Sequence, residues 1–467
     1  MSFQHAQLAR KIIESIGGNR RCFPIKATHV ASVSSTYPPL PGEFHSKLLR
    51  LIRNAKERVY LASLYIGPAA SSTATAEREL LDALADLAAH RPEVEIKLLM
   101  DANRALRPVK TTQLDENTSS AEAVYKCIQA RTSRDSKPCA LYLFNPSPRL
   151  LLPSPLNEVA GVFHIKCYII DDNLILSGAN LSQEYFTNRQ DRCAWFTNGG
   201  GGLVDFYVDL MNTLCDYGSV YCDPIKNMGN KQVLIQTLAT LMTDSHDRDQ
   251  SVSTADNDPI IAYAMPTFQA PSLPVSNDVH VTQQLLSCAA REQCSIQLAS
   301  AYLNPTRPLL QSLSNFQDVQ LLTAGPKSHG FAPKVGLERK GDWVPQVFQT
   351  ISENLAQQHE VLLYSRPGWT FHAKGLWVTS PRDNLVAAMV GSGNYGYRSW
   401  HRDVESNIVM VFPEQSSTLQ TMLKDEWTSL CRHAELAHLE QTNEQDTDSL
   451  LSPAIIHAGL PLIQRFL

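Results

Sequence analysis

A chain of 467 residues exceeds the usual size of one hydrophobic core, so we expect two domains. Its composition, 43% apolar and 19% charged, is typical of a globular protein. The formal net charge of −5 argues against a nucleic-acid-binding protein, because such proteins usually carry an excess of basic residues. No run of 18 apolar residues occurs, so no membrane-spanning helix is predicted. Ten cysteines without a Cys-x-x-Cys pair indicate no zinc site.

The two ends of the chain differ in character. Residues 1–21 are basic and poor in acids, and Ile12, Ile13 and Ile16 share one possible helix face. This pattern fits part of a mitochondrial targeting segment and fits an amphipathic first helix about equally well. Residues 454–467 are apolar, and would either lie in a membrane interface or cap the fold.

Between these ends the chain carries an internal repeat. Residues 59–68 resemble residues 296–305, and each stretch is followed by a predicted helix and a further strand. Alternating strands and helices imply sheets covered by helices. A polar, Asp- and Ser-rich stretch separates the halves and is predicted as a linker. The predicted divisions are an N-terminal extension (1–40), a first domain (41–243), the linker (244–259), a second domain (260–436) and a C-terminal segment (437–467).

The second part of each half contributes one histidine, one lysine and one asparagine. The first set is His164, Lys166 and Asn180, and the second is His372, Lys374 and Asn394. Each His-x-Lys is predicted to lie in a strand, 162–170 in the first half, so that imidazole and ammonium share a face. Histidine can act as a nucleophile or proton carrier near neutral pH. Lysine and asparagine, together with the turn residues Ser177 and Ser392, can donate to phosphate oxygens.

Three acids accompany these sets. Asp191 and Glu405 each follow the motif asparagine by eleven residues, which makes them the candidates to orient the two imidazoles. Asp171 follows the first His-x-Lys; we count it with the catalytic residues and expect it to form a structural ion pair. The corresponding position of the second half is Thr379.

The arrangement His-x-Lys-x4-Asp-x6-Gly-x-Asn resembles the signature of the phospholipase D superfamily. The first copy matches it in full, whereas the second lacks the Asp and has about six extra residues before its Gly-Ser. A closer similarity, to eukaryotic phosphatidylglycerophosphate synthases, rests on residues 176–192, 371–377 and 396–405. The resemblance implies an α/β fold of two similar phospholipase D-like halves. Each half would be a mixed sheet flanked by helices, and the halves would pack with pseudo-twofold symmetry.

The same resemblance implies a function. The phosphatidyl group of CDP-diacylglycerol would pass to glycerol 3-phosphate, giving phosphatidylglycerophosphate and CMP on the pathway to cardiolipin. By similarity to the superfamily, His164 would be the nucleophile and form a phosphatidyl-histidine. His372 would then serve as general acid and later as general base. The scheme requires no metal or other cofactor, and it implies peripheral attachment to the matrix side of the mitochondrial inner membrane.

An acceptor that carries its own phosphate requires further cations. The candidates are Arg192, Lys327, Arg398 and Arg402, since arginine in particular suits bidentate phosphate binding. The alternatives are a phosphatidylserine synthase of the same superfamily, a phospholipase D or nucleic-acid phosphodiesterase, and an inactive scaffold. The run from Thr187 to Arg192 favours glycerol 3-phosphate over serine as the acceptor. The acidic net charge disfavours nucleic acid as a partner, and two complete motif sets argue against a scaffold.

Overall fold

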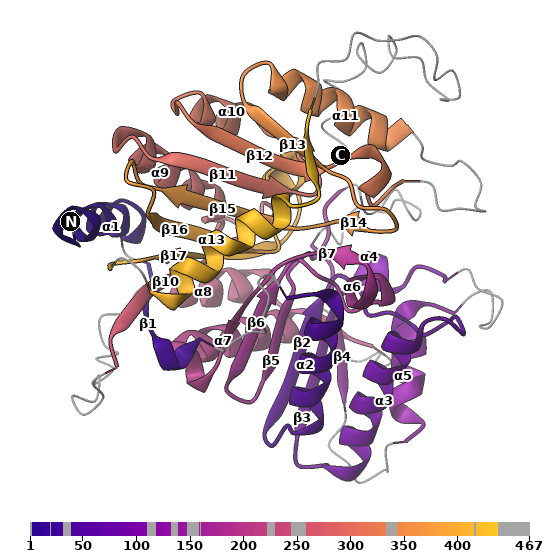
Figure 1. Ribbon diagram of the computed structural model, residues 1–467. Coiled ribbons are helices and arrows are strands. Elements are labelled where there is room, and N and C mark those ends of the chain that lie inside the picture. Colours follow the sequence, from indigo (N-terminus) through magenta and orange to yellow (C-terminus); the bar gives the residue numbers. More distant parts are fainter. Residues whose placement is uncertain are drawn as a thin grey trace.

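The structure is a computed structural model with two α/β halves that meet along one side (Figure 1). Most of the predicted linker (244–257) and the segment 438–467 lie outside the described residues. The prediction of mixed sheets flanked by helices is confirmed. The structure describes residues 2–18, 20–30, 39–109, 118–131, 139–146, 158, 160–221, 229–243, 258–332, 343–414 and 417–437.

The first half is built on a sheet with seven strands among the described residues, in the spatial order β8-β6-β5-β2-β3-β4-β9. Strands β2, β3 and β4 run parallel, whereas β5, β6 and β8 form an antiparallel run beside β2. The bounds are β2 (Arg58–Ser63), β3 (Glu95–Asp101), β4 (Ala140–Phe144), β5 (Cys167–Ile170), β6 (Asn173–Ser177), β8 (Cys193–Phe196) and β9 (Ser219–Val220).

The second half repeats this arrangement. Strands β11, β12 and β13 run parallel, and β15, β16 and β17 form the antiparallel run beside β11. In the described residues its sheet has nine strands, in the order β1-β10-β17-β16-β15-β11-β12-β13-β18. The bounds are β1 (Phe23–Lys26), β10 (Ile260–Gln269), β11 (Ser295–Ser300), β12 (Val319–Ala324), β13 (Glu360–Tyr364), β15 (Lys374–Thr379), β16 (Leu385–Gly391), β17 (Glu405–Val411) and β18 (Ala434–Leu436).

Helices cover both sheets because their apolar residues recur every three or four positions. In α3, for example, Leu80, Leu84, Leu87 and Ala88 are buried. The α-helices are α1 (Ser2–Gly17), α2 (Pro41–Arg53), α3 (Thr75–His90), α4 (Ala102–Ala105), α5 (Ser120–Gln129), α6 (Gln183–Thr187), α7 (Leu203–Tyr217), α8 (Lys231–Met242), α9 (Asp278–Arg291), α10 (Arg307–Leu313), α11 (Trp343–Ala356), α12 (Tyr397–His401) and α13 (Thr418–Cys431). Short 3-10 helices in the described residues include η1 (Ala27–His29), η3 (Asn198–Gly202) and η4 (Pro326–Ser328). In the part of the chain that the structure describes, no helix has the length and apolarity needed to cross a membrane.

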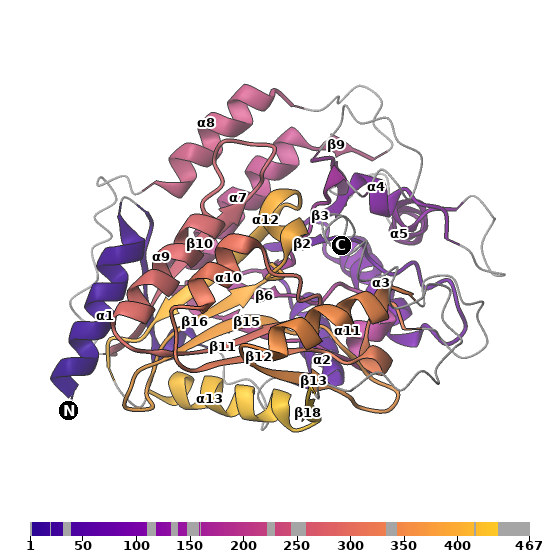
Figure 2. The ribbon, with the colours of Figure 1, turned by 90° about the horizontal axis from the view of Figure 1, so that it is seen from above.

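The N-terminal residues pack on the second half. Helix α1 buries Leu8, Ile12 and Ile16 in the same cluster as α9 (Figure 2), whereas Ile13 is only half-buried. Strand β1 then pairs with β10 and forms one edge of the nine-stranded sheet. Residues 2–18 and 20–26 therefore belong structurally with a sheet whose other described strands begin at Ile260.

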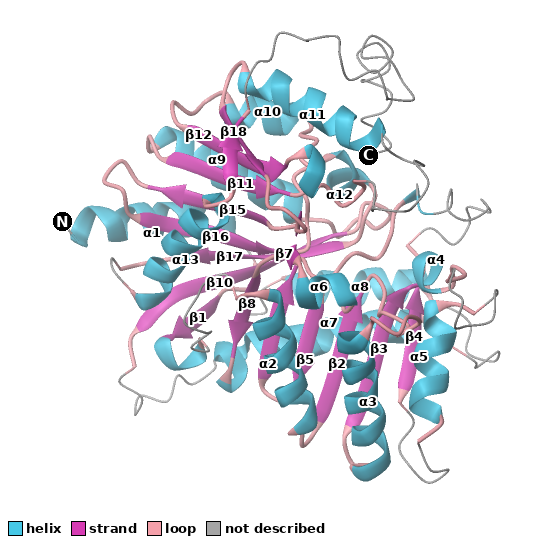
Figure 3. Cartoon of the chain, turned by 45° about the vertical axis from the view of Figure 1, so that its right-hand side comes forward, coloured by secondary structure: helices cyan, strands magenta, loops and turns pink. Residues whose placement is uncertain are grey.

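Main-chain hydrogen bonds join the two halves at two equivalent places. Strand β7 (Arg189–Gln190) of the first half lies near the middle of the molecule (Figure 3) and pairs with β14 (Thr370–Phe371) of the second, as Figure 1 also shows. An isolated bridge joins Phe163 to Val404. The prediction that a strand begins at residue 162 is therefore wrong. Strand β5 begins at Cys167, because the residues before it bond across to the other half.

Candidate active site

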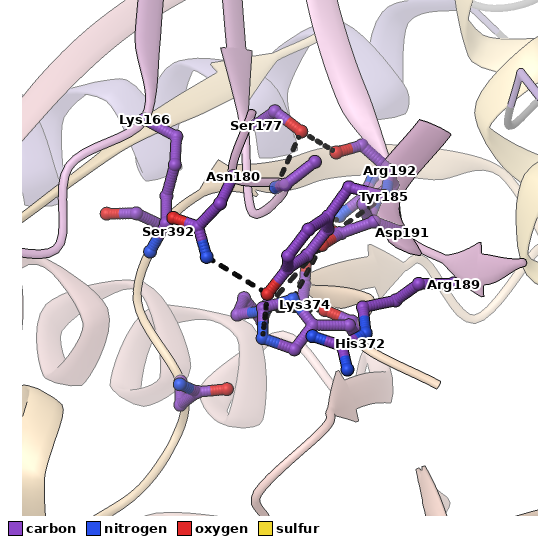
Figure 4. A network of polar contacts seen from close by, with 12 residues as sticks. Lys166, Ser177, Asn180, Tyr185, Arg189, Asp191, Arg192, His372, Lys374 and Ser392 are labelled. Carbon is purple, nitrogen blue, oxygen red and sulfur yellow. Dashed lines mark hydrogen bonds and ion pairs between the residues drawn. The ribbon is translucent and has the colours of Figure 1, made fainter. Parts of the chain in front are cut away.

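The two motif histidines lie where the halves meet, and each is held by a carboxylate of the opposite half. His164 Nδ1 lies 2.9 Å from Glu405 Oε1, and His372 Nδ1 lies 2.6 Å from Asp191 Oδ2. All four residues are buried. Figure 4 shows His372 beside Asp191. A carboxylate at Nδ1 favours the tautomer with its proton there, which leaves Nε2 as the reactive nitrogen.

Main-chain hydrogen bonds bring each histidine to the carboxylate of the opposite half. The backbone N–H of His164 donates to the carbonyl oxygen of Val404 at 2.8 Å, and that of His372 donates to Gln190 at 2.7 Å. In both cases the acceptor residue directly precedes the carboxylate residue. One backbone hydrogen bond therefore fixes the distance between each imidazole and its acid.

The two carboxylates have different support. Glu405 accepts hydrogen bonds from Ser392 Oγ at 2.5 Å and from Ser399 Oγ at 2.8 Å. Asp191 accepts the backbone N–H of Arg192 at 2.9 Å. Burial raises the pKa of Asp191 to about 6, even though nearby lysines oppose the shift. The ionisation of the acid beside His372 therefore falls near neutral pH.

The motif lysines are also buried. Lys166 Nζ donates to the carbonyl oxygen of His164 at 2.7 Å, and Lys374 Nζ donates to that of His372 at 2.6 Å. Burial lowers the pKa of Lys374 to about 8 and that of Lys166 well below its usual value. Both ammonium groups have lost much of their hydration, so an entering anion would be bound strongly.

The two imidazoles differ in their electrostatic surroundings. Burial is the largest cause that lowers the pKa of each. At His164 the charge of Glu405 opposes this effect. At His372 the charges of Lys374 and Arg189 add to it, so its pKa falls well below the usual value. An anionic ligand would neutralise these cations and raise the pKa of His372 again.

The motif asparagines are not equivalent in their contacts. Asn180 Nδ2 donates to the hydroxyl oxygen of Tyr185 at 3.0 Å, and that oxygen lies 3.3 Å from His372 Nε2 (Figure 4). Asn180 Oδ1 accepts from Ser63 at 3.3 Å. Asn394 Oδ1 is buried and has no hydrogen-bond partner within the described residues. The second amide thus remains available to a ligand.

Three sequence-based assignments do not fit the structure. Ser177 donates to the carbonyl oxygen of Arg192 at 2.8 Å and Ser392 donates to Glu405, so both hydroxyls bind protein groups. Asp171 lies in the turn between β5 and β6, with a φ of 49°. Its carboxylate accepts the backbone N–H groups of residues 56–58. It is therefore neither catalytic nor the ion-pair residue that we predicted, because it binds the turn before β2.

Arg192 is likewise not a substrate-binding residue. Its guanidinium is fully buried and forms a two-point ion pair with Glu426, at 3.0 and 2.5 Å. It also donates to the carbonyl oxygens of Lys374 and Met389 and stacks over Trp377 at 4.1 Å. These contacts join the first half to the second and leave no surface for a phosphate.

Arg189, which the sequence analysis did not select, has the position that was expected of Arg192. Side chains alternate along a strand, so Arg189 shares a face with Asp191 whereas Arg192 takes the opposite face. Arg189 stacks over the ring of Tyr185 at 4.6 Å, and that ring lies 5.1 Å from the ring of His372. Alternation along residues 189–192 would have placed Arg189 on the face of Asp191, but it does not show which of the two arginines the opposite half encloses.

The remaining predicted cations are Arg398, Arg402 and Lys327. Arg398 Nη2 donates to the carbonyl oxygen of Glu158 at 2.9 Å and pairs with Asp403 at 3.1 Å. Arg402 is half-buried, with its guanidinium 5.7 Å from the ring of Tyr397. Lys327 is exposed in η4. Among the described residues no cluster of three or more His, Cys, Asp or Glu side chains is suited to hold a metal ion.

Comparisons with known proteins agree with this geometry. Residues 48–200 match the family described as cardiolipin synthase, PLD-like domain. The chain is 30% identical to the mitochondrial CDP-diacylglycerol–glycerol-3-phosphate 3-phosphatidyltransferase of Gallus gallus, over 88% of this chain and 79% of that protein. It is 31% identical to the protein of that name from Homo sapiens, over 87% of this chain and 78% of that protein. Phosphatidylserine synthase of Haemophilus influenzae Rd KW20 has the same fold, with a TM-score of 0.73, 20% identity and coverage of 98% of this chain and 100% of that one. The family predicted from the motifs is thereby confirmed: the chain belongs to the CDP-diacylglycerol–glycerol-3-phosphate 3-phosphatidyltransferase family.

Proposed function

We propose that this protein transfers the phosphatidyl group of CDP-diacylglycerol to glycerol 3-phosphate, releasing CMP and forming phosphatidylglycerophosphate for the cardiolipin pathway. The observation that carries the proposal is the crossed pair of imidazoles, His164 with Glu405 and His372 with Asp191, in one buried site. Family membership supplies the substrates.

In the first step His164 Nε2 attacks the phosphorus that bears the diacylglycerol. The bond from phosphorus to the CMP oxygen breaks as the new P–N bond forms, and His372 Nε2 gives its proton to that oxygen. The diphosphate brings negative charge next to Lys374 and so raises the pKa of His372, which lets this imidazole carry a proton. Lys166 and Lys374 stabilise the charge that develops on the non-bridging oxygens.

In the second step the phosphatidyl-histidine is resolved by the acceptor. His372 Nε2 takes the proton from a hydroxyl of glycerol 3-phosphate, whose oxygen then attacks the phosphorus. The P–N bond to His164 breaks, and both imidazoles return to their starting states. Dividing one displacement into two steps lowers the barrier of each. Asn394, with its unpaired Oδ1, is available to orient a hydroxyl or water in the site.

Product analysis tests this function. The purified protein is incubated with CDP-diacylglycerol and with glycerol 3-phosphate, serine or water alone as acceptor. We expect CMP and phosphatidylglycerophosphate only with glycerol 3-phosphate. Phosphatidylserine as the main product would indicate a serine acceptor, and phosphatidic acid at equal rate in water would indicate a hydrolase. Both outcomes would contradict the proposal.

We also propose that the protein attaches peripherally to the matrix face of the mitochondrial inner membrane. The lipid substrate supports this placement, and the relatives from Gallus gallus and Homo sapiens are named mitochondrial proteins. Flotation with vesicles that contain CDP-diacylglycerol tests membrane attachment, and protease protection in isolated mitochondria tests the face.

A further inference from the structure

The two halves place opposite charges at equivalent positions beside the site. Helices α6 and α12 each follow the motif asparagine by the same number of residues. At the fourth position after the asparagine the first half has Glu184 and the second has Arg398. At the ninth position the first half has Arg189 and the second has Asp403. Each half forms an ion pair between these two positions, at 2.8 Å in the first and 3.1 Å in the second, but the polarity is reversed.

The inner member of each pair lies next to a histidine. Arg189 Nε donates to Thr370 Oγ1 at 2.9 Å, two residues before His372. Asp403 Oδ1 accepts the backbone N–H of Val162 at 3.0 Å, two residues before the other histidine. A permanent cation therefore flanks His372, where Figure 4 shows the Arg189 side chain beside the imidazole, and an acid flanks its partner.

The proposed reaction requires such a difference. The diacylglycerol remains on the phosphorus throughout, whereas CMP departs from the side of the general acid and the acceptor enters on the side of the general base. One histidine serves both roles, so both groups occupy the same side in turn. CMP and glycerol 3-phosphate each carry a phosphate besides the reacting phosphorus. The general acid and base should therefore have an additional cation, and the nucleophile should not.

We infer that Arg189 binds this second phosphate, first that of the departing CMP and then that of glycerol 3-phosphate. The inference rests on the proposed function and assigns the leaving group and the acceptor to the side of His372. Arginine suits the task because its planar fork can bind two phosphate oxygens at once. Its present partner, the Glu184 carboxylate, is about a third exposed, so it can turn outward when a phosphate takes its place.

A second buried donor lies close by. His329 is 1% exposed and its Nδ1 accepts the backbone N–H of Phe331 at 3.2 Å, so Nε2 carries the proton. That Nε2 has no hydrogen-bond partner within the described residues. The ring of His329 lies 5.2 Å from that of Tyr302, which lies 5.7 Å from that of His372. His329 thus has an N–H group that no described residue accepts, and only the ring of Tyr302 separates it from His372.

A competition between two acceptors tests the role of Arg189. Glycerol 3-phosphate and a molar excess of glycerol are offered together, and the ratio of phosphatidylglycerophosphate to phosphatidylglycerol is measured. Both products arise from the same phosphatidyl-enzyme, so the ratio does not depend on the first step. In Arg189→Gln we expect the ratio to fall by about ten- to over a hundredfold, the value of one charge-assisted hydrogen bond. Arg189→Lys should restore part of it, and His329→Phe should lower it less.

Two further variants make the result decisive. Arg131→Gln removes an exposed arginine that pairs with Asp82 and Asp86, and it should keep the wild-type ratio and activity. Arg398→Gln removes the oppositely placed arginine. A ratio that falls in Arg398→Gln and not in Arg189→Gln would move the phosphate to the other side and overturn the inference. Equal loss of both products in Arg189→Gln, with the ratio unchanged, would show a purely structural role. Failure of the unmodified chain to make phosphatidylglycerophosphate would instead contradict the proposed function itself.

Discussion

The two halves agree in the residues proposed to reach the reacting phosphorus and differ in the residues that support them. His, Lys and Asn recur in each half. Five residues after the asparagine, however, the first half has Tyr185, whose hydroxyl lies beside His372 Nε2, and the second has Ser399, which donates to Glu405. Holding a phosphoryl group from two sides is the same task for both halves. Attack and proton transfer are different tasks, and the unmatched residues are the ones that can separate them.

Replacing the histidines should have the largest effect and tests whether the two halves have different roles. His164→Ala and His372→Ala should each lower turnover by at least ~10² to 10⁴-fold, because each removes a nucleophile or a proton carrier. The two losses should differ in kind. A phosphatidyl ester of p-nitrophenol can replace CDP-diacylglycerol, and its leaving group needs little protonation. With this substrate His372→Ala should release p-nitrophenol, whereas His164→Ala should not. Rescue of the His164 variant alone would reverse the assigned roles, and near wild-type turnover by either would refute a shared site.

The buried pair between Arg192 and Glu426 is a difference between the halves with a structural effect. The position equivalent to Arg192 is Ser406, so at this position the first half inserts a guanidinium into the other and the second half does not. Glu426→Gln should lower the free energy of unfolding by about 3–5 kcal/mol, since it leaves a buried charge without its partner. Chemical denaturation measures this. The double variant Arg192→Met, Glu426→Leu is the control and should recover much of the loss. A change below about 1 kcal/mol for Glu426→Gln would show that the pair is solvated.

The pH profile should report the ionisation of Asp191 and of Lys374. Activity requires ionised Asp191, whose pKa is raised to about 6, so kcat/KM should rise as pH increases through about 6. It also requires charged Lys374, whose pKa is lowered to about 8, so kcat/KM should fall as pH increases beyond about 8. In Lys374→Arg the alkaline limb should move out of the measured range, at a lower absolute rate. Lys424 is half-buried and pairs with Asp383, so Lys424→Arg should keep the wild-type profile. An alkaline limb that persists in Lys374→Arg would show that a group other than Lys374 sets it.

The sequence was sufficient for the parts of the site that repeat. The two motif sets and the equal spacing of Asp191 and Glu405 depend on a pattern within one chain, and the structure places these acids beside the imidazoles of opposite halves. The repeated β-α-β units also predicted the sheets, because alternation and helical periodicity are local properties.

The parts that failed depend on contacts between the halves. Arg189 and Arg192 are the same residue type and lie three positions apart in the sequence. Only their contacts with the second half show which guanidinium is enclosed. The start of β5 moved for the same reason, because the residues around His164 satisfy their backbone groups on the second half. Asp171 could not be placed from the motif alone, since its partners are backbone N–H groups more than a hundred residues earlier in the chain.

The smallest expected effect concerns the Tyr185 hydroxyl. It accepts from Asn180 Nδ2 and lies 3.3 Å from His372 Nε2, so in the free protein it can donate to the neutral imidazole. Burial raises the pKa of Tyr185, which keeps its proton in place across the working range of pH. In Tyr185→Phe the ring remains, with its contacts to His372 and Arg189, and only the hydroxyl is lost. A neutral hydrogen bond is worth about 0.5–1.5 kcal/mol, so kcat should fall by roughly two- to twelvefold.

A matched control separates this effect from stability. Tyr207 is buried, and its hydroxyl lies 3.0 Å from Ser406 Oγ, in the core and not at a histidine. Tyr207→Phe should lower the free energy of unfolding by a similar amount as Tyr185→Phe and leave kcat unchanged. If Tyr185→Phe retained the full kcat, the hydroxyl would only occupy, in the free protein, the position that the substrate phosphate takes. If it lost more than about a hundredfold, the loss would exceed one neutral hydrogen bond, and Tyr185 would take a direct part in proton transfer that Ser399 of the other half cannot.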